Sequence, residues 1–171
     1  MNLETQRLIL QRASIGRLSA LIHGPEEFER VYGHSVEDGY IEYPDVLVFS
    51  LRKAQEFSGD AEWWLPFLMI HRGNGTLIGA CGYNGPPDAD GRVEIGYGIA
   101  PSYRGHGLTT EAAEAMSAAA LLKPGVTGVR ALTSPERNAS TRILSKCGFV
   151  HAGTIDDPDE GPLWQWLRSV S

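Results

Sequence analysis

The chain has 171 residues, and 15 basic against 21 acidic side chains give it a net charge of −6 with neutral histidines. Apolar residues make up 42% of the sequence and charged residues 21%, a balance that excludes a disordered chain and predicts one globular domain over residues 1–171. Cys81 and Cys147 are too few for a disulfide scaffold, and the acidic balance argues against nucleic acid as a partner.

The N-terminus has no basic segment leading into an apolar stretch, so no signal peptide is expected. The longest apolar run, Trp63–Ile70, contains Pro66 and is far shorter than the roughly 20 residues that span a bilayer. We therefore expect a cytoplasmic protein without a membrane partner. Its two cysteines are expected to be reduced and buried, like small apolar residues.

The first third of the chain predicts a strand followed by helices. Thr5–Arg12 has an apolar centre between polar flanks, and we expect an edge strand there. Apolar residues at helical spacing follow Ser14, which predicts a short helix with Ser14 as its N-cap. After a Gly-Pro break, Glu26–Val31 predicts a second helical piece, and Gly33–Gly59 is expected to form short helices and loop.

The middle of the chain predicts three consecutive strands. Trp63–His71 is rich in β-favouring residues, and Gly73-Asn74-Gly75 predicts a hairpin turn into a second strand, Leu77–Tyr83. Asn84–Gly91 contains two prolines and several Asp and Gly residues, which predict a loop. The third strand is expected at Val93–Ile99.

The last third changes from strand to helix spacing and back. A helix is predicted from Leu108 to Leu122, a short strand at Val129–Thr133, and a loop followed by a helix within Ser134–Cys147. Strands are expected at Phe149–Ile155 and Leu163–Leu167. This order of elements favours a mixed sheet with helices on both faces.

A glycine-containing segment, Arg104-Gly105-His106-Gly107, joins a predicted strand to an alanine-rich helix. The two glycines would let backbone N–H groups converge, and the helix start adds positive partial charge, so the segment is a candidate anion site. The alternative is that the glycines make a tight turn and nothing more. No G-x-x-x-x-G-K-S/T motif occurs, and Gly96-Tyr97-Gly98 lacks a third glycine, which excludes a P-loop and disfavours a Rossmann site.

The same segment carries a family resemblance. Arg104–Thr109 resembles the acetyl-CoA signature Q/R-x-x-G-x-G/A of the GNAT N-acetyltransferase superfamily, and Ser140–Phe149 looks like its S-x-R-x-L-x-K-x-G-F helix end. Thr5–Leu10 resembles the T-x-R-L-x-L start of the ribosomal-protein-alanine N-acetyltransferase (Rim-type) branch. The sequence departs at Thr109, where the signature has Gly or Ala, and at Arg137, where the branch often has Asn.

The resemblance implies a GNAT-like α/β (α+β) fold. Its central sheet would be mixed but mostly antiparallel, with about 6–7 strands, helices on both faces and a splay between Val93–Ile99 and Val129–Thr133. Acetyl-CoA would enter the splay, with its pyrophosphate on the backbone N–H groups of the signature loop. The implied cofactor-binding residues are Ile99, Ala100, Arg104, Gly105, His106, Gly107, Leu108, Thr109 and Asn138.

The resemblance also implies two catalytic roles. Glu94 is the candidate base that removes a proton from the amine, with the alternative that it faces solvent or pairs with Arg92 or another cation. Many family members donate a hydrogen bond to the leaving thiolate from a Tyr, but the matching helix here carries Leu144. Ser140 is therefore the candidate thiol partner, with the alternative that it caps the helix Thr141–Lys146.

Other polar residues give weaker signals. The five histidines show no metal-ligand spacing, so no metal is expected. An acidic cluster lies between the last two predicted strands, where it would border the acceptor cleft of a GNAT-like fold or form a solvated loop. The cluster consists of Asp156, Asp157, Asp159 and Glu160.

The first hypothesis is thus an acetyl-CoA-dependent N-acetyltransferase that acts, as a monomer or homodimer, on a primary amine of a protein N-terminus or a small molecule. The alternative is a non-catalytic acyl-CoA-binding or sensor module of the same fold, motivated by Thr109 and the missing Tyr. A third, weaker hypothesis is a phosphate-binding domain for another nucleotide. The acceptor stays open, because a fold does not determine a substrate.

Overall fold

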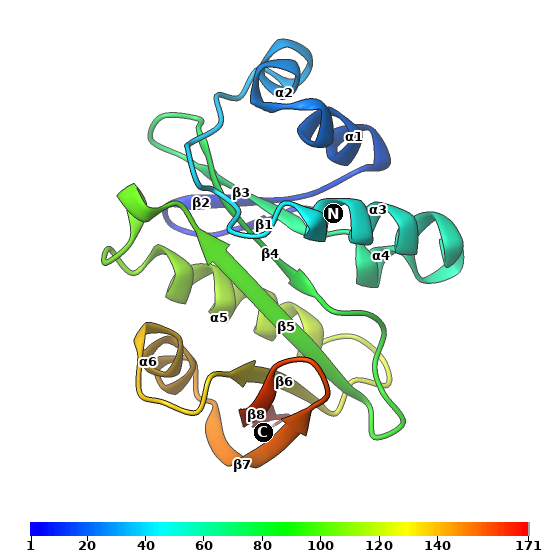
Figure 1. Ribbon diagram of the computed structural model, residues 1–171, viewed down its shortest axis with the longest axis vertical. Helices are drawn as coiled ribbons and strands as arrows, with labels where there is room; N and C mark the ends of the chain where they lie inside the picture. Colours follow the sequence, from blue (N-terminus) through cyan, green and yellow to red (C-terminus); the bar gives the residue numbers. More distant parts are fainter. Residues whose placement is uncertain (171) are drawn as a thin grey trace.

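The computed structural model describes residues 1–170, which form one eight-stranded sheet in the order β1-β2-β3-β4-β5-β6-β8-β7 (Figure 1). Neighbouring strands are antiparallel, apart from the parallel pair β5 and β6. The predicted mixed, mostly antiparallel sheet is confirmed, with eight strands where about 6–7 were expected. The strands are β1 (Leu3–Glu4), β2 (Leu8–Arg12), β3 (Phe67–His71), β4 (Leu77–Tyr83), β5 (Arg92–Ile99), β6 (Gly128–Thr133), β7 (Val150–Asp157) and β8 (Gly161–Ser169).

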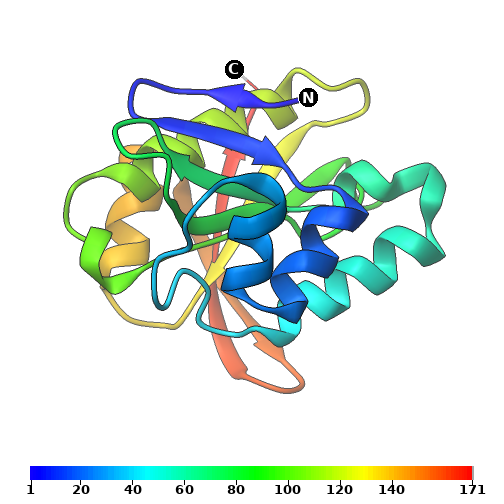
Figure 2. The same cartoon turned by 90° about the horizontal axis from the view of Figure 1, so that it is seen from above.

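Helices cover both faces of the sheet, as predicted (Figures 1 and 2). One face carries α1 (Ile15–His23), α2 (Pro25–Tyr32) and α3 (Asp45–Glu56), and the other carries α5 (Leu108–Leu121) and α6 (Ala139–Lys146). Three short helical turns connect these elements: η1 (Ser58–Asp60), α4 (Ala61–Trp64) and η2 (Pro101–Tyr103). Within residues 1–170, every helix is too short or too polar to cross a membrane.

The side chains of β3 show how the two faces are filled. Phe67 and Met69 belong to the core beneath α5, whereas Leu68 and Ile70 pack in a second core with α1 and α2. All four side chains are buried, so alternate residues of one strand supply both cores. Cys81 is buried as well, and burial raises the pKa of its thiol to about 12.

The predicted edge strand at Thr5–Arg12 is wrong in two respects. The strand begins at Leu8, and β1 lies outside it, with Leu3 paired to Leu10. The Thr5 N–H donates to the carbonyl of Leu8 at 3.0 Å, and the Thr5 hydroxyl oxygen accepts from the Leu8 N–H at 3.0 Å. This turn reverses the chain, so β1 forms the edge and β2 is an inner strand.

The predicted strand Trp63–His71 begins four residues too early. Trp63 and Trp64 end helix α4, and β3 starts at Phe67. The Trp63 ring is buried edge-on against Tyr83, with ring centroids 5.2 Å apart. This tertiary contact outweighs the β preference of the aromatic residues.

The segment Gly33–Gly59 is more regular than expected. It contains α3, a single helix of 12 residues whose buried side chains are Leu47, Ser50 and Ala54. Exposed apolar residues such as Val48 and Phe49 interrupt the helical spacing in the sequence. The apolar pattern alone therefore does not reveal the buried face of this helix.

The predicted splay between the central strands is confirmed. Backbone pairing between β5 and β6 covers Arg92, Val93 and Glu94 opposite Gly128, Val129 and Arg130. β5 continues to Ile99 beside β4, and β6 continues to Thr133 beside β8. The two halves of the sheet thus separate after Glu94, and the C-terminal half of β5 borders an opening.

Candidate functional site

A groove of about 440 Å³ lies between the end of β5, the start of α5 and the start of α6. Sixteen residues line it, among them six of the nine predicted cofactor-binding residues and the predicted thiol partner Ser140. Those six are Ile99, Arg104, Gly105, Gly107, Leu108 and Thr109. The signature loop and the Ser140 region therefore meet on one surface, although 35 positions of sequence separate Gly105 from Ser140 (140 − 105).

The signature loop has the backbone expected of an anion site. Gly105 and Gly107 have φ angles of +80° and +78°, in the left-handed region that a side chain would strain. Gly107 directly precedes α5, a helix of 14 residues whose first N–H groups lack partners within the helix. A Cβ atom at Gly105 would meet no atom within 4 Å, so the loop lies against open space.

Three cations line the same groove. Arg104 comes from the loop, and Arg142 and Lys146 lie one turn apart on α6. Of these three, only Arg104 is among the cofactor-binding residues expected from the sequence, although the spacing of Arg142 and Lys146 already placed them on one helix face. The cations and the start of α5 together make the groove suitable for a polyanion.

The loop is held in place by the N-terminal motif. Arg7 donates from Nη1 to the carbonyl of His106 at 2.8 Å and from Nε to Glu111 at 2.9 Å. Glu111 also accepts from the backbone N–H of Arg7 at 2.6 Å and from the hydroxyl of Thr5. Burial alone would raise the pKa of Glu111, but these hydrogen bonds together lower it.

Three predicted cofactor residues do not line the groove. The Ala100 N–H donates to the carbonyl of Ile78 at 2.7 Å, so it is already used within the sheet. The carbonyl of His106 accepts from Arg7. The Asn138 side chain caps α6: its Oδ1 accepts from the Thr141 N–H at 3.1 Å. Cofactor contacts by these residues stay predictions.

Asn138, and not Ser140, caps helix α6. The N-cap of α6 is Asn138, and Ser140 lies inside the helix, so the alternative that Ser140 caps the helix is wrong. Ser140 is half-buried and lines the groove with its neighbour Ala139. Ser140 therefore lines the groove without a capping role.

Tyr97 is a site residue that the sequence analysis did not select. Its ring extends from β5 toward α6, and its hydroxyl donates to the carbonyl of Ser140 at 3.4 Å. Burial raises the pKa of this phenol to about 12, still further above neutral pH than that of an ordinary tyrosine. The sequence around Tyr97 does not reveal this contact, because the hydrogen bond joins two residues 43 positions apart.

Glu94 forms the ion pair that was its alternative role. Its Oε2 accepts from Arg130 Nη2 at 2.7 Å, and its Oε1 accepts from Asn84 Nδ2 at 2.9 Å. It lines a cavity of about 390 Å³ that has no lining residue in common with the groove, together with Asp157, Asp159 and Glu160 of the predicted acidic cluster. Three of the four residues of the predicted acidic cluster therefore lie beside Glu94, and their place along an acceptor cleft stays a prediction.

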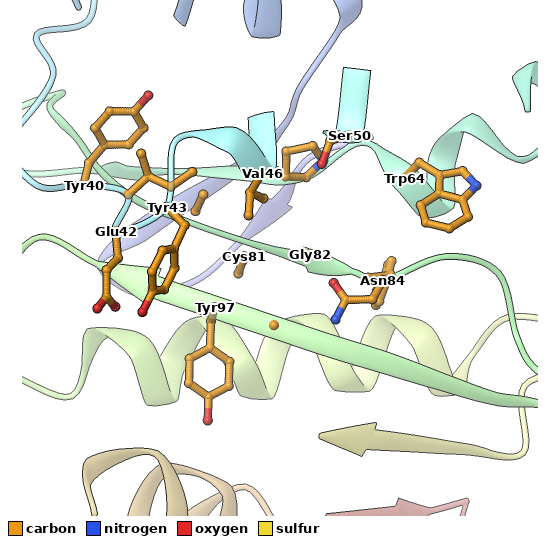
Figure 3. A pocket seen from close by; sticks show the side chains of 16 residues that line it. Tyr40, Glu42, Tyr43, Val46, Ser50, Trp64, Cys81, Gly82, Asn84 and Tyr97 are labelled. Atoms are coloured by element: carbon orange, nitrogen blue, oxygen red, sulfur yellow. The ribbon is translucent and has the colours of Figure 1, made fainter. Parts of the chain in front are cut away.

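A second cavity, of about 260 Å³, opens on the other face of β5 (Figure 3). Tyr40, Tyr43 and Trp64 stand around it, and Gly96 and Gly98 of β5 belong to its lining. This aromatic cavity and the groove have Glu42, Tyr97 and Gly98 in common, so the two spaces meet across β5.

Glu42 is the second site residue that sequence analysis missed. It lies in the segment between α2 and α3, where the sequence gave little structural information. Figure 3 shows its carboxylate beside the Tyr43 ring, and the charge of Glu42 raises the pKa of Tyr43. Within residues 1–170, no group of three or more His, Cys, Asp or Glu side chains has the arrangement of a metal site.

Comparisons with known proteins agree with this geometry. The family model described as "Acetyltransferase (GNAT) domain" matches residues 7–150. The chain is 26% identical over 152 residues to the uncharacterized N-acetyltransferase YjdG of Bacillus subtilis, covering 86% of this chain and 89% of that protein.

Solved structures show the same fold. A putative GnaT-family acetyltransferase from Bordetella pertussis superposes with a TM-score of 0.71 at 20% identity, over 99% of both chains. The ribosomal L7/L12 alpha-N-protein acetyltransferase RimL, solved in complex with coenzyme A, superposes with a TM-score of 0.72 at 13% identity, over 99% of this chain and 98% of that one.

Proposed function

The chain belongs to the acetyltransferase (GNAT) family, and from that premise we propose that it transfers an acetyl group from acetyl-CoA to a primary amine. The observation that carries the proposal is the meeting of two spaces at the splayed end of β5. One is a cation-lined groove and the other an aromatic cavity, and Tyr97 and Gly98 belong to both. We further propose that residues 1–171 form a single acetyltransferase domain.

The groove suits acetyl-CoA as a co-substrate. Backbone N–H groups of the loop and the first turn of α5 would bind the pyrophosphate, with Arg104, Arg142 and Lys146 supplying positive charge. The pantetheine arm would follow the C-terminal half of β5, which borders the splay. The coenzyme A seen in the RimL structure supports this assignment by analogy of fold.

The transfer itself needs an unprotonated amine next to the thioester. Attack of the amine on the carbonyl forms the amide bond, and the bond from carbonyl carbon to sulfur breaks to release a thiolate. Positioning the amine in the cavity beside the groove supplies a large part of the rate enhancement. A backbone N–H near Ile99 would stabilise the oxyanion of the intermediate.

Two side chains are proposed to handle the protons. Glu94 stays our predicted base, although its carboxylate is held in an ion pair with Arg130 at 2.7 Å and would have to leave that pair to reach the amine. Ser140 stays the predicted hydrogen-bond donor to the thiolate, whose conjugate thiol has a pKa of about 8.5. The Tyr97 hydroxyl, next to Ser140, is a second donor of the right type.

A thiol-release assay tests this function. Acetyl-CoA is incubated with the protein and with amines of different classes: peptides starting with Ala, Ser or Met, amino acids, polyamines, aminoglycosides and simple monoamines. Release that requires an acceptor would establish the transfer. Binding of CoA without release from any acceptor would support the non-catalytic acyl-CoA-binding module, and absence of CoA binding would refute both.

A further inference from the structure

We propose that the aromatic cavity takes a small monoamine with an apolar body and no carboxylate, held by its ammonium group on Glu42. This inference rests on the proposed transfer function and names the acceptor class for it. It follows from three features of the cavity: its floor, its walls and its charge.

The floor is a strip of very small residues on two paired strands. Gly98 lies opposite Ala80 and Gly96 opposite Gly82 in the register of β5 and β4. A Cβ at Gly98 would meet no atom within 4 Å, so this position opens directly on free space. A flat or slender apolar body can therefore lie on the backbone of β5, close to the groove on the other side.

The walls are largely aromatic. Trp64 lies in the cavity wall, braced by Phe49 and Phe57 with ring centroids 6.1 and 6.2 Å away. Tyr43 and Val46 line another side, and both are exposed, as expected at the mouth of an open cavity. Such walls favour apolar or aromatic ligand groups and offer few partners for a peptide backbone.

The charge of the cavity has one sign. Among residues 1–170, Glu42 is the single charged residue that lines it. The lining therefore contains no arginine or lysine that could pair with a ligand carboxylate. A carboxylate buried in this cavity would have no cationic partner. A second ammonium group, as in a polyamine, would find no further carboxylate in this lining and would have to reach the adjoining acidic cavity, which shares Asn84 and Gly96 with it.

Glu42 places the ammonium at the reacting position. It lines the groove as well as the cavity, so a cation beside it lies next to the space assigned to the thioester. The Glu42 carboxylate attracts the protonated amine, and its negative charge repels acidic acceptors at the entrance. Glu42 therefore acts in binding and orientation, and Glu94 stays the proposed proton acceptor.

Matched acceptors test the inference. Phenylalanine carries a carboxylate next to its amine, phenylalanine amide a neutral amide, and 2-phenylethylamine neither group. Because these groups also change the amine pKa, kcat/KM is compared for the unprotonated fraction of each amine. We expect kcat/KM for 2-phenylethylamine and phenylalanine amide to exceed that for phenylalanine by at least about 100-fold, because the carboxylate would be desolvated without a partner. Spermidine and an Ala-starting peptide should also be poor acceptors.

A variant pair isolates the role of Glu42. Glu42 is exposed, so Glu42→Gln is expected to raise KM for 2-phenylethylamine about two- to fivefold, leaving the Kd for CoA unchanged. Glu29→Gln removes an exposed charge on α2, away from both cavities, and should behave like the wild type. Glu42→Asp, which keeps the charge, should recover part of the affinity.

Direct binding separates this inference from the proposed function. Calorimetry measures 2-phenylethylamine and phenylalanine against the protein saturated with CoA, whether or not turnover occurs. Binding of the monoamine but not the amino acid supports the cavity assignment even if no thiol is released, an outcome that would refute the transfer function alone. Equal binding of both, or preferred turnover of amino acids, polyamines or peptides, overturns the inference while the transfer function stands.

Discussion

Replacing Arg7 by Ala should weaken the signature loop, Arg104–Thr109, from a distance. Arg7 lies just before β2, and its side chain bonds to the carbonyl of His106 and to Glu111 on α5. It does not line the groove itself. The substitution therefore removes support for the loop and leaves every proposed cofactor contact chemically unchanged.

The expected loss in the free energy of unfolding follows from the two hydrogen bonds of the Arg7 side chain and from its exposure to water. A hydrogen bond to a charged group contributes about 1.5–3 kcal/mol when shielded. The Arg7 side chain is 43% exposed, so screening by water reduces the pair to about 1–2 kcal/mol in total. In a protein of this size, that loss lowers Tm by about 2–8 °C.

The effect on CoA binding is separate. If the loss of the bond to His106 frees one residue of the loop, ordering that residue on binding costs about 1–2 kcal/mol. The Kd for CoA should then rise by about five- to thirtyfold. Thermal unfolding measures the stability change, and calorimetry measures the affinity at a temperature where both proteins are folded.

Arg72→Ala is the matched control. Arg72 follows β3 and pairs with Glu4 of β1 at 2.6 Å. Its side chain is 39% exposed, and it makes no hydrogen bond to the signature loop. It should cost similar or less stability and leave the Kd for CoA unchanged. An Arg7→Ala protein that binds CoA as tightly as the wild type would refute the reasoning, and so would an equal loss of affinity in Arg72→Ala.

Three further outcomes are expected. Asn138→Ala removes the cap of α6 and should lower the free energy of unfolding by about 1 kcal/mol, measured by urea titration; an unchanged midpoint would contradict the capping role. Because its bonds lower the pKa of Glu111, this carboxylate stabilises the fold above about pH 4.5, and the stabilisation is lost as the pH falls through the lowered pKa. Glu111→Gln should therefore be less stable at pH 7 and lose less stability than the wild type on acidification below pH 4.5, as thermal scans across pH can show. Ser140→Ala should lower kcat by about 100-fold with the Kd for CoA unchanged, and an equally large loss in Tyr97→Phe but not in Ser140→Ala would assign the thiolate donor to Tyr97.

Local patterns in the sequence predicted most of the fold. Leu77–Tyr83 matches β4 at both ends, because apolar residues and the preceding Gly73–Gly75 turn act within a few positions of one another. The helix expected from Leu108 begins there, after a left-handed Gly107. The expected N-cap at Ser14 is confirmed, with its side chain accepting from the Arg17 N–H at 3.1 Å.

The wrong or missing predictions share one cause: each depends on a contact between residues far apart in the sequence. Trp63 sits in a helix because its ring packs against Tyr83, a contact that residue preference does not contain. Thr5–Leu10 was noted as a family landmark, but its bond from Arg7 to His106 spans 99 positions. Glu42 reaches the site from a segment without a clear pattern, and its role depends on a cavity formed by β4 and β5.

The splay also predicts where the backbone of the sheet should separate locally in solution. β1 to β5 form one half-sheet and β6, β8 and β7 the other, and they are joined by three paired residues of β5 and by α5, which packs on strands of both. Amide hydrogens on facing parts of β5 and β6 should therefore exchange with solvent by local separation, well before the core under α5 unfolds. A molecule inserted between the halves would act as a missing strand, so occupancy should slow exchange on both sides together.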